Sequence, residues 1–210
     1  NMKRTNLLLT ALLLPLMAMA AEVKSPNGNV IVKFALNSGR PAYEMTFKGK
    51  QVVKPSSLGL ELAKDKHASK GMDETDLMDG FVIKNEQTSA FDETWEPVWG
   101  ETRTIRNRYN ELAVTLTQPA NRRDIIIRFR VYDDGMGLRY EFPQQQTLNY
   151  FIIKEEHTQF AMAGDHTAYY VPGDYDTQEY NVCTNKLSQI RAAFPEIMKA
   201  HGGNSSSTTF

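Results

Sequence analysis

Cysteine is almost absent from this chain: Cys183 is the only one among its 210 residues. A single cysteine excludes an internal disulfide, although disulfides are common in exported proteins. Stability must therefore come from a packed core, and the chain is long enough to bury one. A catalytic thiol needs a neighbouring group that keeps it ionised, and the sequence does not point to one. We interpret Cys183 as an ordinary small residue.

An excess of charge of either sign is also missing. The chain has 24 basic and 25 acidic residues, so it lacks the basic balance typical of nucleic-acid-binding proteins, and we expect no nucleic-acid partner. The sequence has neither a phosphate-binding glycine loop nor the nucleophile elbow of serine hydrolases. These absences leave carboxylates and aromatic rings as the candidate functional groups.

Long apolar runs are confined to the N-terminus. The chain starts with the basic pair Lys3-Arg4, continues with an almost wholly apolar run over residues 7–17, and reaches a small-x-small sequence at residues 18–20. This order is typical of a secretory signal peptide, which we assign to residues 1–21, including one residue before the methionine. The apolar run is short for a membrane span, although an uncleaved anchor remains the alternative.

Removal of the signal peptide would change the net charge of the protein. The presence of a signal peptide also indicates the compartment in which the protein works. Cleavage before Ala21 or Glu22 removes two of the 24 basic residues and leaves 22 against 25 acidic ones, a net charge of about −3. No cysteine follows the cleavage sequence, so a lipoprotein is not indicated. We expect a periplasmic protein with no membrane partner after cleavage.

Alternation of apolar and polar residues predicts the fold class. Five segments show it: residues 30–36, 43–47, 112–116, 125–131 and 138–142. A period of two is typical of strands with one buried face. Turn sequences separate the runs, with Ser38-Gly39 between the first two and Asp133-Asp134-Gly135 after the fourth. We therefore predict an all-β fold, an antiparallel β-sandwich.

The remaining segments are expected to be irregular or helical. Residues 64–79 are charged and lose the alternation, which predicts a loop. Helical spacing appears only around residues 187–194, where Pro195 is expected to interrupt it. We assign the sandwich domain to residues 22–201 and a polar loop to residues 202–210. Because a complete sandwich is not expected to stop in a polar loop after a helix, we expect the domain to be incomplete here.

The segment FDETWEPVWGE, residues 91–101, holds both tryptophans and four carboxylates. Trp95 and Trp99 flank Pro97, which disfavours a regular helix. Flat rings beside carboxylates suit the C–H face and the hydroxyl edge of a sugar, so both tryptophans are candidate substrate-binding residues. The alternative is a buried aromatic corner of the β-domain, because large aromatics dominate cores.

A second acidic cluster lies in VPGDYDTQEY, residues 171–180. Asp174, Asp176 and Glu179 follow a Pro-Gly turn, and a loop of this kind can gather oxygen ligands for a hard cation such as calcium. The EF-hand pattern is absent, and solvated surface carboxylates are the alternative. His157 and His166 lack the spacing of zinc ligands.

Six segments together resemble the N-terminal domain of glycoside hydrolase family 97, and within it the calcium-dependent α-glucosidases. They are SPNGNVIVKF from residue 25, KPSSLGLEL from 54, FDETWEPVWGE from 91, IRNRYNELAVTL from 105, IRFRVYDDGMGLRYEFPQQ from 127 and GDYDTQEY from 173. The resemblance implies a galactose-mutarotase-like sandwich followed by a catalytic (β/α)₈ barrel and a small β-domain. The barrel carries the acid and the base or nucleophile, so no catalytic residue can be assigned in this chain.

The resemblance implies one functional residue here. The family's glutamate in GDYDTQEY reaches the barrel's active site and binds calcium, and the matching residue is Glu179. Asp174 and Asp176 are then expected to shape the loop. The implied activity is hydrolysis of α-glucan oligosaccharides by an inverting α-glucosidase, to which this domain contributes a calcium ligand. Two alternatives stay open: the corresponding domain of a retaining α-galactosidase, and a free-standing carbohydrate-binding or adhesion sandwich.

Overall fold

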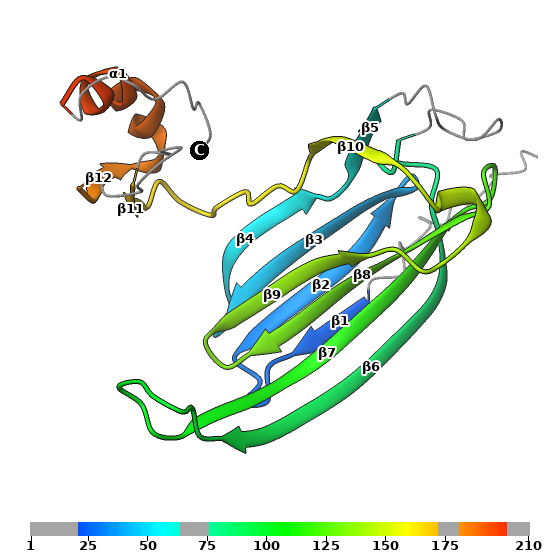
Figure 1. The fold of residues 1–210 in the computed structure, drawn as a ribbon, viewed down its shortest axis with the longest axis horizontal. Coiled ribbons are helices and arrows are strands. Elements are labelled where there is room, and N and C mark those ends of the chain that lie inside the picture. The colour runs from blue at the N-terminus through cyan, green and yellow to red at the C-terminus, as the bar shows by residue number, and fades with distance from the viewer. Residues whose placement is uncertain (1–20, 64–75, 172–180, 201–210) are drawn as a thin grey trace, which may run out of the picture.

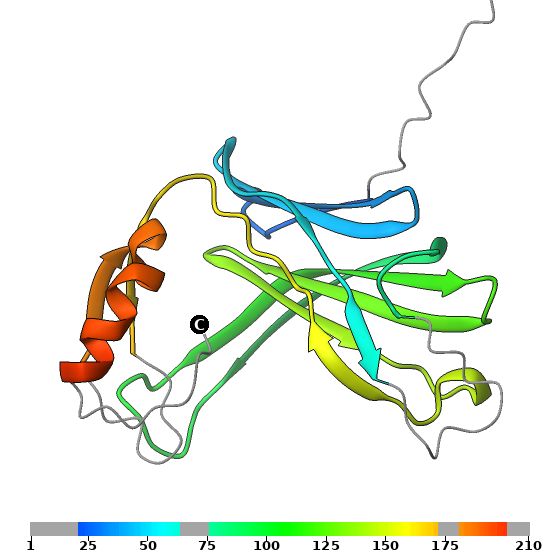
Figure 2. The same ribbon diagram turned by 90° about the horizontal axis from the view of Figure 1, so that it is seen from above.

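The structure, a computed structural model, describes residues 21–63, 76–171 and 181–200. Two four-stranded antiparallel sheets lie face to face (Figures 1 and 2). The first has the order β1 (Ala21–Lys24), β2 (Val30–Asn37), β3 (Arg40–Phe47) and β4 (Lys50–Ser57). The second has the order β6 (Val82–Trp95), β7 (Ile105–Gln118), β8 (Arg123–Tyr132) and β9 (Gly135–Glu141). The predicted all-β sandwich is confirmed.

The core lies between the two sheets, where the apolar residues that alternate along the strands of each sheet meet. Phe34 of β2 and Tyr43 of β3 both contact Phe129 of β8, with ring centroids 6.2 and 5.9 Å apart. Phe129 is fully buried, as are Ile127 and Val131 on the same strand. Burial of each such side chain is worth about 1.5–3 kcal/mol. The five alternating segments are therefore strands that contribute one face to this core.

Left-handed backbone closes two hairpins of the first sheet. Ser38 and Gly39, with φ of 52° and 80°, connect β2 to β3, and Lys48 and Gly49, with φ of 49° and 76°, connect β3 to β4. Two successive residues with positive φ form a turn whose twist matches that of the strands. The sequence predicted the first of these turns and not the second, because lysine is an uncommon residue at such a position.

Later parts of the chain cover the outer edge of β4. After η1 (Gln146–Leu148), β10 (Ile152–Glu156) pairs with β5 (Leu60–Ala63). The chain then runs along β4, where the Gln159 N–H donates to the Ser57 carbonyl at 2.9 Å and the Lys54 N–H donates to the Ala161 carbonyl at 2.7 Å. On an open strand edge these backbone N–H and C=O groups would be unpaired and could form hydrogen bonds with another chain. The bonds to residues 159 and 161 satisfy them within the molecule.

The expected loop at residues 64–79 is described only from Asp76 onward. There, Leu77 is fully buried and pairs with Leu60 through a β-bridge. The Gln118 side-chain amide donates to the carbonyls of Asp76 and Asp79, at 2.8 and 2.7 Å. The described part of the segment, residues 76–79, is irregular as expected, yet it contributes a core residue that the charged composition concealed.

Strand β6 is one of the two edge strands of the second sheet and overhangs the sandwich. All of its residues except Ile83 are exposed, because β1 packs over β7 and β8 rather than over β6. The strand is held by its pairing with β7, from Val82 opposite Thr117 to Trp95 opposite Ile105. Figure 1 shows that this long hairpin extends beyond the shorter strands of the first sheet.

A smaller group of elements lies apart from the sandwich in both views (Figures 1 and 2). It consists of β11 (Thr167–Tyr170), β12 (Cys183–Lys186), η2 (Leu187–Gln189) and α1 (Ile190–Ala200), which we call the hairpin–helix unit. The predicted short helix is confirmed, but the expected interruption at Pro195 is wrong, since α1 continues through it. Pro195 is the sixth of the eleven residues of α1, so it removes the one backbone hydrogen bond that its N–H would donate within the helix, and α1 forms in spite of that loss. Within the described ranges, no helix has the length and apolar character to cross a membrane.

Candidate functional site

The predicted calcium ligand, Glu179, lies outside the described residues, as do Asp174 and Asp176. The two strands that flank this stretch are described. Antiparallel pairing joins β11 to β12, with Tyr170 opposite Cys183 as the last pair before it. The Tyr170 hydroxyl also donates to the Asn185 side-chain oxygen at 2.8 Å. The segment that carries Glu179 is therefore the connection of a two-stranded hairpin.

A set of hydrogen bonds fixes the base of this hairpin to the start of the helix. The Asp165 carboxylate accepts bonds from the Ser188 backbone N–H and hydroxyl, both at 2.9 Å. The Leu187 N–H donates to the His166 carbonyl at 3.0 Å. The bond from the Ser188 N–H, with that from its hydroxyl, lowers the pKa of Asp165, so the ionised form is the one that holds the contact.

The hairpin–helix unit exposes apolar side chains. Tyr169 is 74% exposed and Val182 is 64% exposed, and Leu187 is also exposed. The unit therefore leaves apolar side chains exposed that a neighbouring surface would cover.

The two tryptophans lie at the far end of the β6–β7 hairpin. Trp95 is the last residue of β6 and is 48% exposed, and Trp99, in the bend after Pro97, is 87% exposed. The alternative of a buried aromatic corner is therefore wrong for both. The structure does not bring the tryptophans together with the hairpin–helix unit, which lies at a different corner of the molecule in Figure 1. Their role in substrate binding stays a prediction.

An ion-pair network that sequence reasoning missed covers the outer face of the second sheet. Arg128 donates to both oxygens of Glu141, at 2.7 and 2.8 Å, and also to Glu111. Arg130 donates to the other oxygen of Glu111 at 2.7 Å, and Arg139 donates to Glu141 at 2.6 Å. The signal was present in IRFRVY, where Arg128 and Arg130 alternate with apolar residues and so lie on the face opposite the core.

The network shifts the protonation of its members. The hydrogen bond from Arg128, followed by that from Arg139, lowers the pKa of Glu141 from 4.5 to about 2. Burial raises the pKa of Glu111, but hydrogen bonds from Arg130 and Arg128 outweigh it and hold that pKa below its usual value. The bonds to Glu141 and Glu111 raise the pKa of Arg128 despite partial burial. The carboxylates are therefore charged throughout the physiological range.

One cluster near the β5–β10 pair is compatible with binding a metal ion. Potential ligand atoms of Glu61, Glu155 and His157 all lie within 4.8 Å of one another. However, Lys154 already forms an ion pair with Glu61, and the third ligand would be an imidazole nitrogen. Calcium prefers six to eight oxygen ligands, so this cluster fits calcium less well than an all-carboxylate site. Sequence reasoning missed it because Glu61 is distant in the chain from the other two.

Comparisons with known proteins give the relationship. A sequence profile of the family described as glycosyl-hydrolase 97 N-terminal matches residues 23–207. The chain belongs to this family. Solved structures of a family 97 enzyme from Pseudoalteromonas sp. strain K8, in complex with panose and with acarbose, are 33% identical, with a TM-score of 0.69 over 80% of this chain. The predicted relationship to family 97 is confirmed.

The match concerns one part of those enzymes. The chain spans 24% of the length of the Pseudoalteromonas structures. A β-arabinopyranosidase also matches, with a TM-score of 0.60 and 21% identity over 72% of this chain and 22% of its own. At that identity the likeness concerns the fold alone. The family to which the chain belongs is a family of glycoside hydrolases.

Proposed function

We propose that this chain is the N-terminal domain of an exported, calcium-dependent, inverting α-glucosidase that acts on maltooligosaccharides in the periplasm. The proposal is supported by the 33% identity to a family 97 enzyme that was solved with panose and with acarbose. Panose consists of glucose units joined by α-linkages, so a relative that binds it accommodates the bonds that such an enzyme would cleave. The residues assigned to the signal peptide support export.

In this proposal the acid and base of the reaction belong to a barrel outside the chain. The chain contributes the Glu179 carboxylate, whose oxygens are the hard ligands that calcium prefers. Bound calcium would supply positive charge beside the substrate hydroxyls and the acid. The pairing of β11 with β12 and the bonds from Ser188 to Asp165 would fix the base from which Glu179 reaches the site.

The surface of the hairpin–helix unit supports such an intramolecular contact. Tyr169, Val182 and Leu187 are exposed here, and they would be covered if the unit packed against a barrel. Because this proposal assigns the acid and the base to the barrel, the domain would complete an active site rather than form one. The separation of the two barrel carboxylates would then decide between inversion and retention.

The test uses the complete enzyme, in which this chain is joined to its barrel. We expect hydrolysis of p-nitrophenyl α-glucoside and of maltooligosaccharides, and little hydrolysis of p-nitrophenyl α-galactoside. The 210-residue chain alone should hydrolyse neither. Preference for the galactoside would favour the retaining α-galactosidase, and activity of the purified chain would show that the acid–base pair had been assigned to the wrong domain.

A further inference from the structure

The outer face of the second sheet carries a row of aromatic rings that crosses three strands. Phe91 of β6 lies opposite Tyr109 of β7, and the two rings stack with centroids 5.3 Å apart and an interplanar angle of 24°. Tyr109 also contacts Tyr132 of β8, with centroids 5.3 Å apart. Phe91 is 39% exposed, so the side of its ring that is turned away from Tyr109 is available. We call these three residues the aromatic row.

Trp95 extends this surface along β6. Alternation along a strand places residues 91, 93 and 95 on the same face, and Trp95 is half exposed. A rise of about 3.4 Å per residue separates Phe91 from Trp95 by about 14 Å. That distance exceeds the width of one sugar ring, so the two aromatic side chains would contact different units of an oligosaccharide.

Polar groups lie between and beside the rings. Glu93 of β6 and its cross-strand partner Asn107 of β7 lie between Phe91 and Trp95. At the other end, the Arg130 guanidinium lies 4.6 Å from the centre of the Tyr109 ring and is held by its bond to Glu111. Carboxylate, amide and guanidinium groups at these places can exchange hydrogen bonds with sugar hydroxyls.

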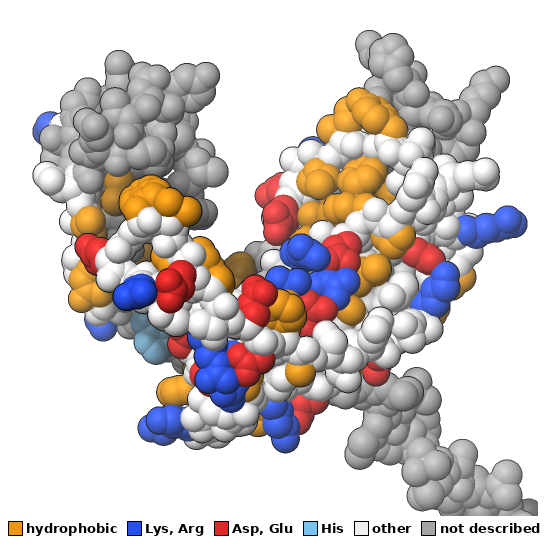
Figure 3. All heavy atoms as spheres, turned by 60° about the horizontal axis from the view of Figure 1, so that its bottom comes forward, with side chains coloured by type: hydrophobic (Ala, Val, Ile, Leu, Met, Phe, Trp, Pro, Cys, Tyr) orange, Lys and Arg blue, Asp and Glu red, His pale blue; other side chains and the backbone are white. Residues whose placement is uncertain are grey.

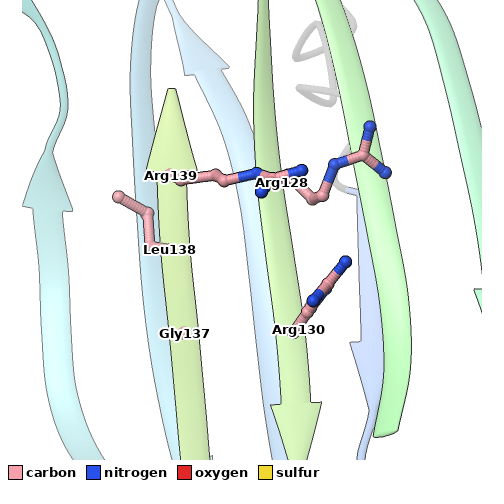
Figure 4. A pocket seen from close by; sticks show the side chains of 5 residues that line it. All are labelled: Arg128, Arg130, Gly137, Leu138 and Arg139. Carbon is pink, nitrogen blue, oxygen red and sulfur yellow. The ribbon is translucent and has the colours of Figure 1, made fainter. Parts of the chain in front are cut away.

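A shallow hollow of 130 Å³ adjoins the row on the side of β9, lined by Arg128, Arg130, Gly137, Leu138 and Arg139 (Figure 4). A Cβ atom at Gly137 would meet no other atom within 4 Å, so the glycine leaves this space open above Arg130. Positive and negative side chains are intermixed over the face seen in Figure 3. An uncharged, hydroxyl-rich ligand suits such a surface better than a polyanion.

We propose that Phe91, which stacks on the buried Tyr109, binds an α-linked gluco-oligosaccharide together with Trp95, Glu93 and Arg130. The C–H faces of successive glucose units stack on Phe91 and Trp95, and Glu93 and Arg130 bond to their hydroxyls. Large aromatic rings that are half exposed, next to fixed polar groups, supply both kinds of contact. The choice of α-linked glucose rests on the proposed function, whereas the position of the surface rests on the geometry alone.

The test measures retardation of the 210-residue chain in native gels that contain soluble amylopectin, compared with gels without polysaccharide. We expect retardation of the wild type, and at least a tenfold loss of apparent affinity in Phe91→Ala and in Trp95→Ala. Arg130→Lys keeps the charge but loses the planar fork, and should bind more weakly than wild type. Phe47→Ala removes an equally exposed ring, 40% against 39%, from the other sheet, and should be retarded like the wild type. Circular dichroism checks that each variant is folded.

The outcomes separate this proposal from the proposed function. An unretarded wild type, or variants retarded as strongly as wild type, would overturn the binding surface. Equal retardation in gels with a soluble β-glucan would overturn the assignment to α-linked glucose. If the complete enzyme hydrolyses α-glucosides while the chain shows no retardation, the surface fails and the proposed function stands. If the chain is retarded but the enzyme cleaves only α-galactosides, the function fails instead.

Discussion

The sandwich and the hairpin–helix unit differ in how far they bury their apolar side chains. In the sandwich, Phe34 and Phe129 are fully buried, and each sheet covers the apolar face of the other. In the hairpin–helix unit, Tyr169 is 74% exposed, and the strands are held mainly by pairing with each other and by Asp165. The sandwich therefore carries its own stability, whereas the unit depends on local hydrogen bonds and on whatever surface covers it. The predicted stability and the predicted calcium ligand therefore lie in different parts of the chain.

Truncation of a core ring should show the largest contrast between the two regions. Phe129→Ala removes a ring that contacts both Phe34 and Tyr43, and should lower the free energy of unfolding by about 3–5 kcal/mol. Tyr169→Ala, the matched change in the hairpin–helix unit, should alter it by less than about 0.5 kcal/mol. Urea unfolding followed by circular dichroism measures both. Comparable losses would mean that the unit shares the core.

The ion-pair network should make the stability of the sandwich depend on acid. The pKa of Glu141 is lowered from 4.5 to about 2 by Arg128 and Arg139, so its contribution is complete above pH 4.5 and is lost as the pH falls toward 2. The free energy of unfolding should drop by about 2–3 kcal/mol over that interval. Glu141→Gln should flatten this part of the profile. A mutant profile with the same slope as the wild type would assign the acid dependence to other carboxylates.

A smaller, local effect is expected at the base of the hairpin. Asp165→Asn removes the charge that accepts two bonds from Ser188, and should accelerate hydrogen exchange of the amides at the start of α1 while leaving those of β2 and β8 unchanged. Ser188→Ala removes only the hydroxyl bond and should have a weaker effect. Equal acceleration in the sandwich would show that the two regions open together.

The sandwich could be predicted from the sequence because the pattern that specifies each strand is local. Alternation at residues 30–36 and 125–131, and the turn at Ser38-Gly39, report directly on strands with one buried face. The same rule failed for β6, because a strand that overhangs its partner sheet has no face to bury and needs no alternation. It also failed for Leu77, one apolar residue in a charged segment, which only the tertiary structure identifies as core.

The candidate site was harder to predict from the sequence for a related reason. The cluster of Glu61, Glu155 and His157 joins residues that are far apart in sequence. The aromatic row joins three consecutive strands, and the proximity of its rings follows from strand register rather than from any motif. Burial of Trp95 and Trp99 could not be decided from composition, since aromatic residues serve both cores and ligand surfaces. Glu179 came from resemblance to family 97 alone. The described residues supply only its hairpin base.

The proposed contribution of a calcium ligand by the connection between β11 and β12 is tested most directly by a calcium titration of activity. After treatment with chelator, the complete enzyme with Glu179→Gln should need at least about tenfold more calcium for half-maximal activity, because even indirect partners of a metal site contribute that much to affinity. Asp176→Asn removes a neighbouring charge and should follow the wild-type curve. Superimposable curves for Glu179→Gln and wild type would contradict the claim.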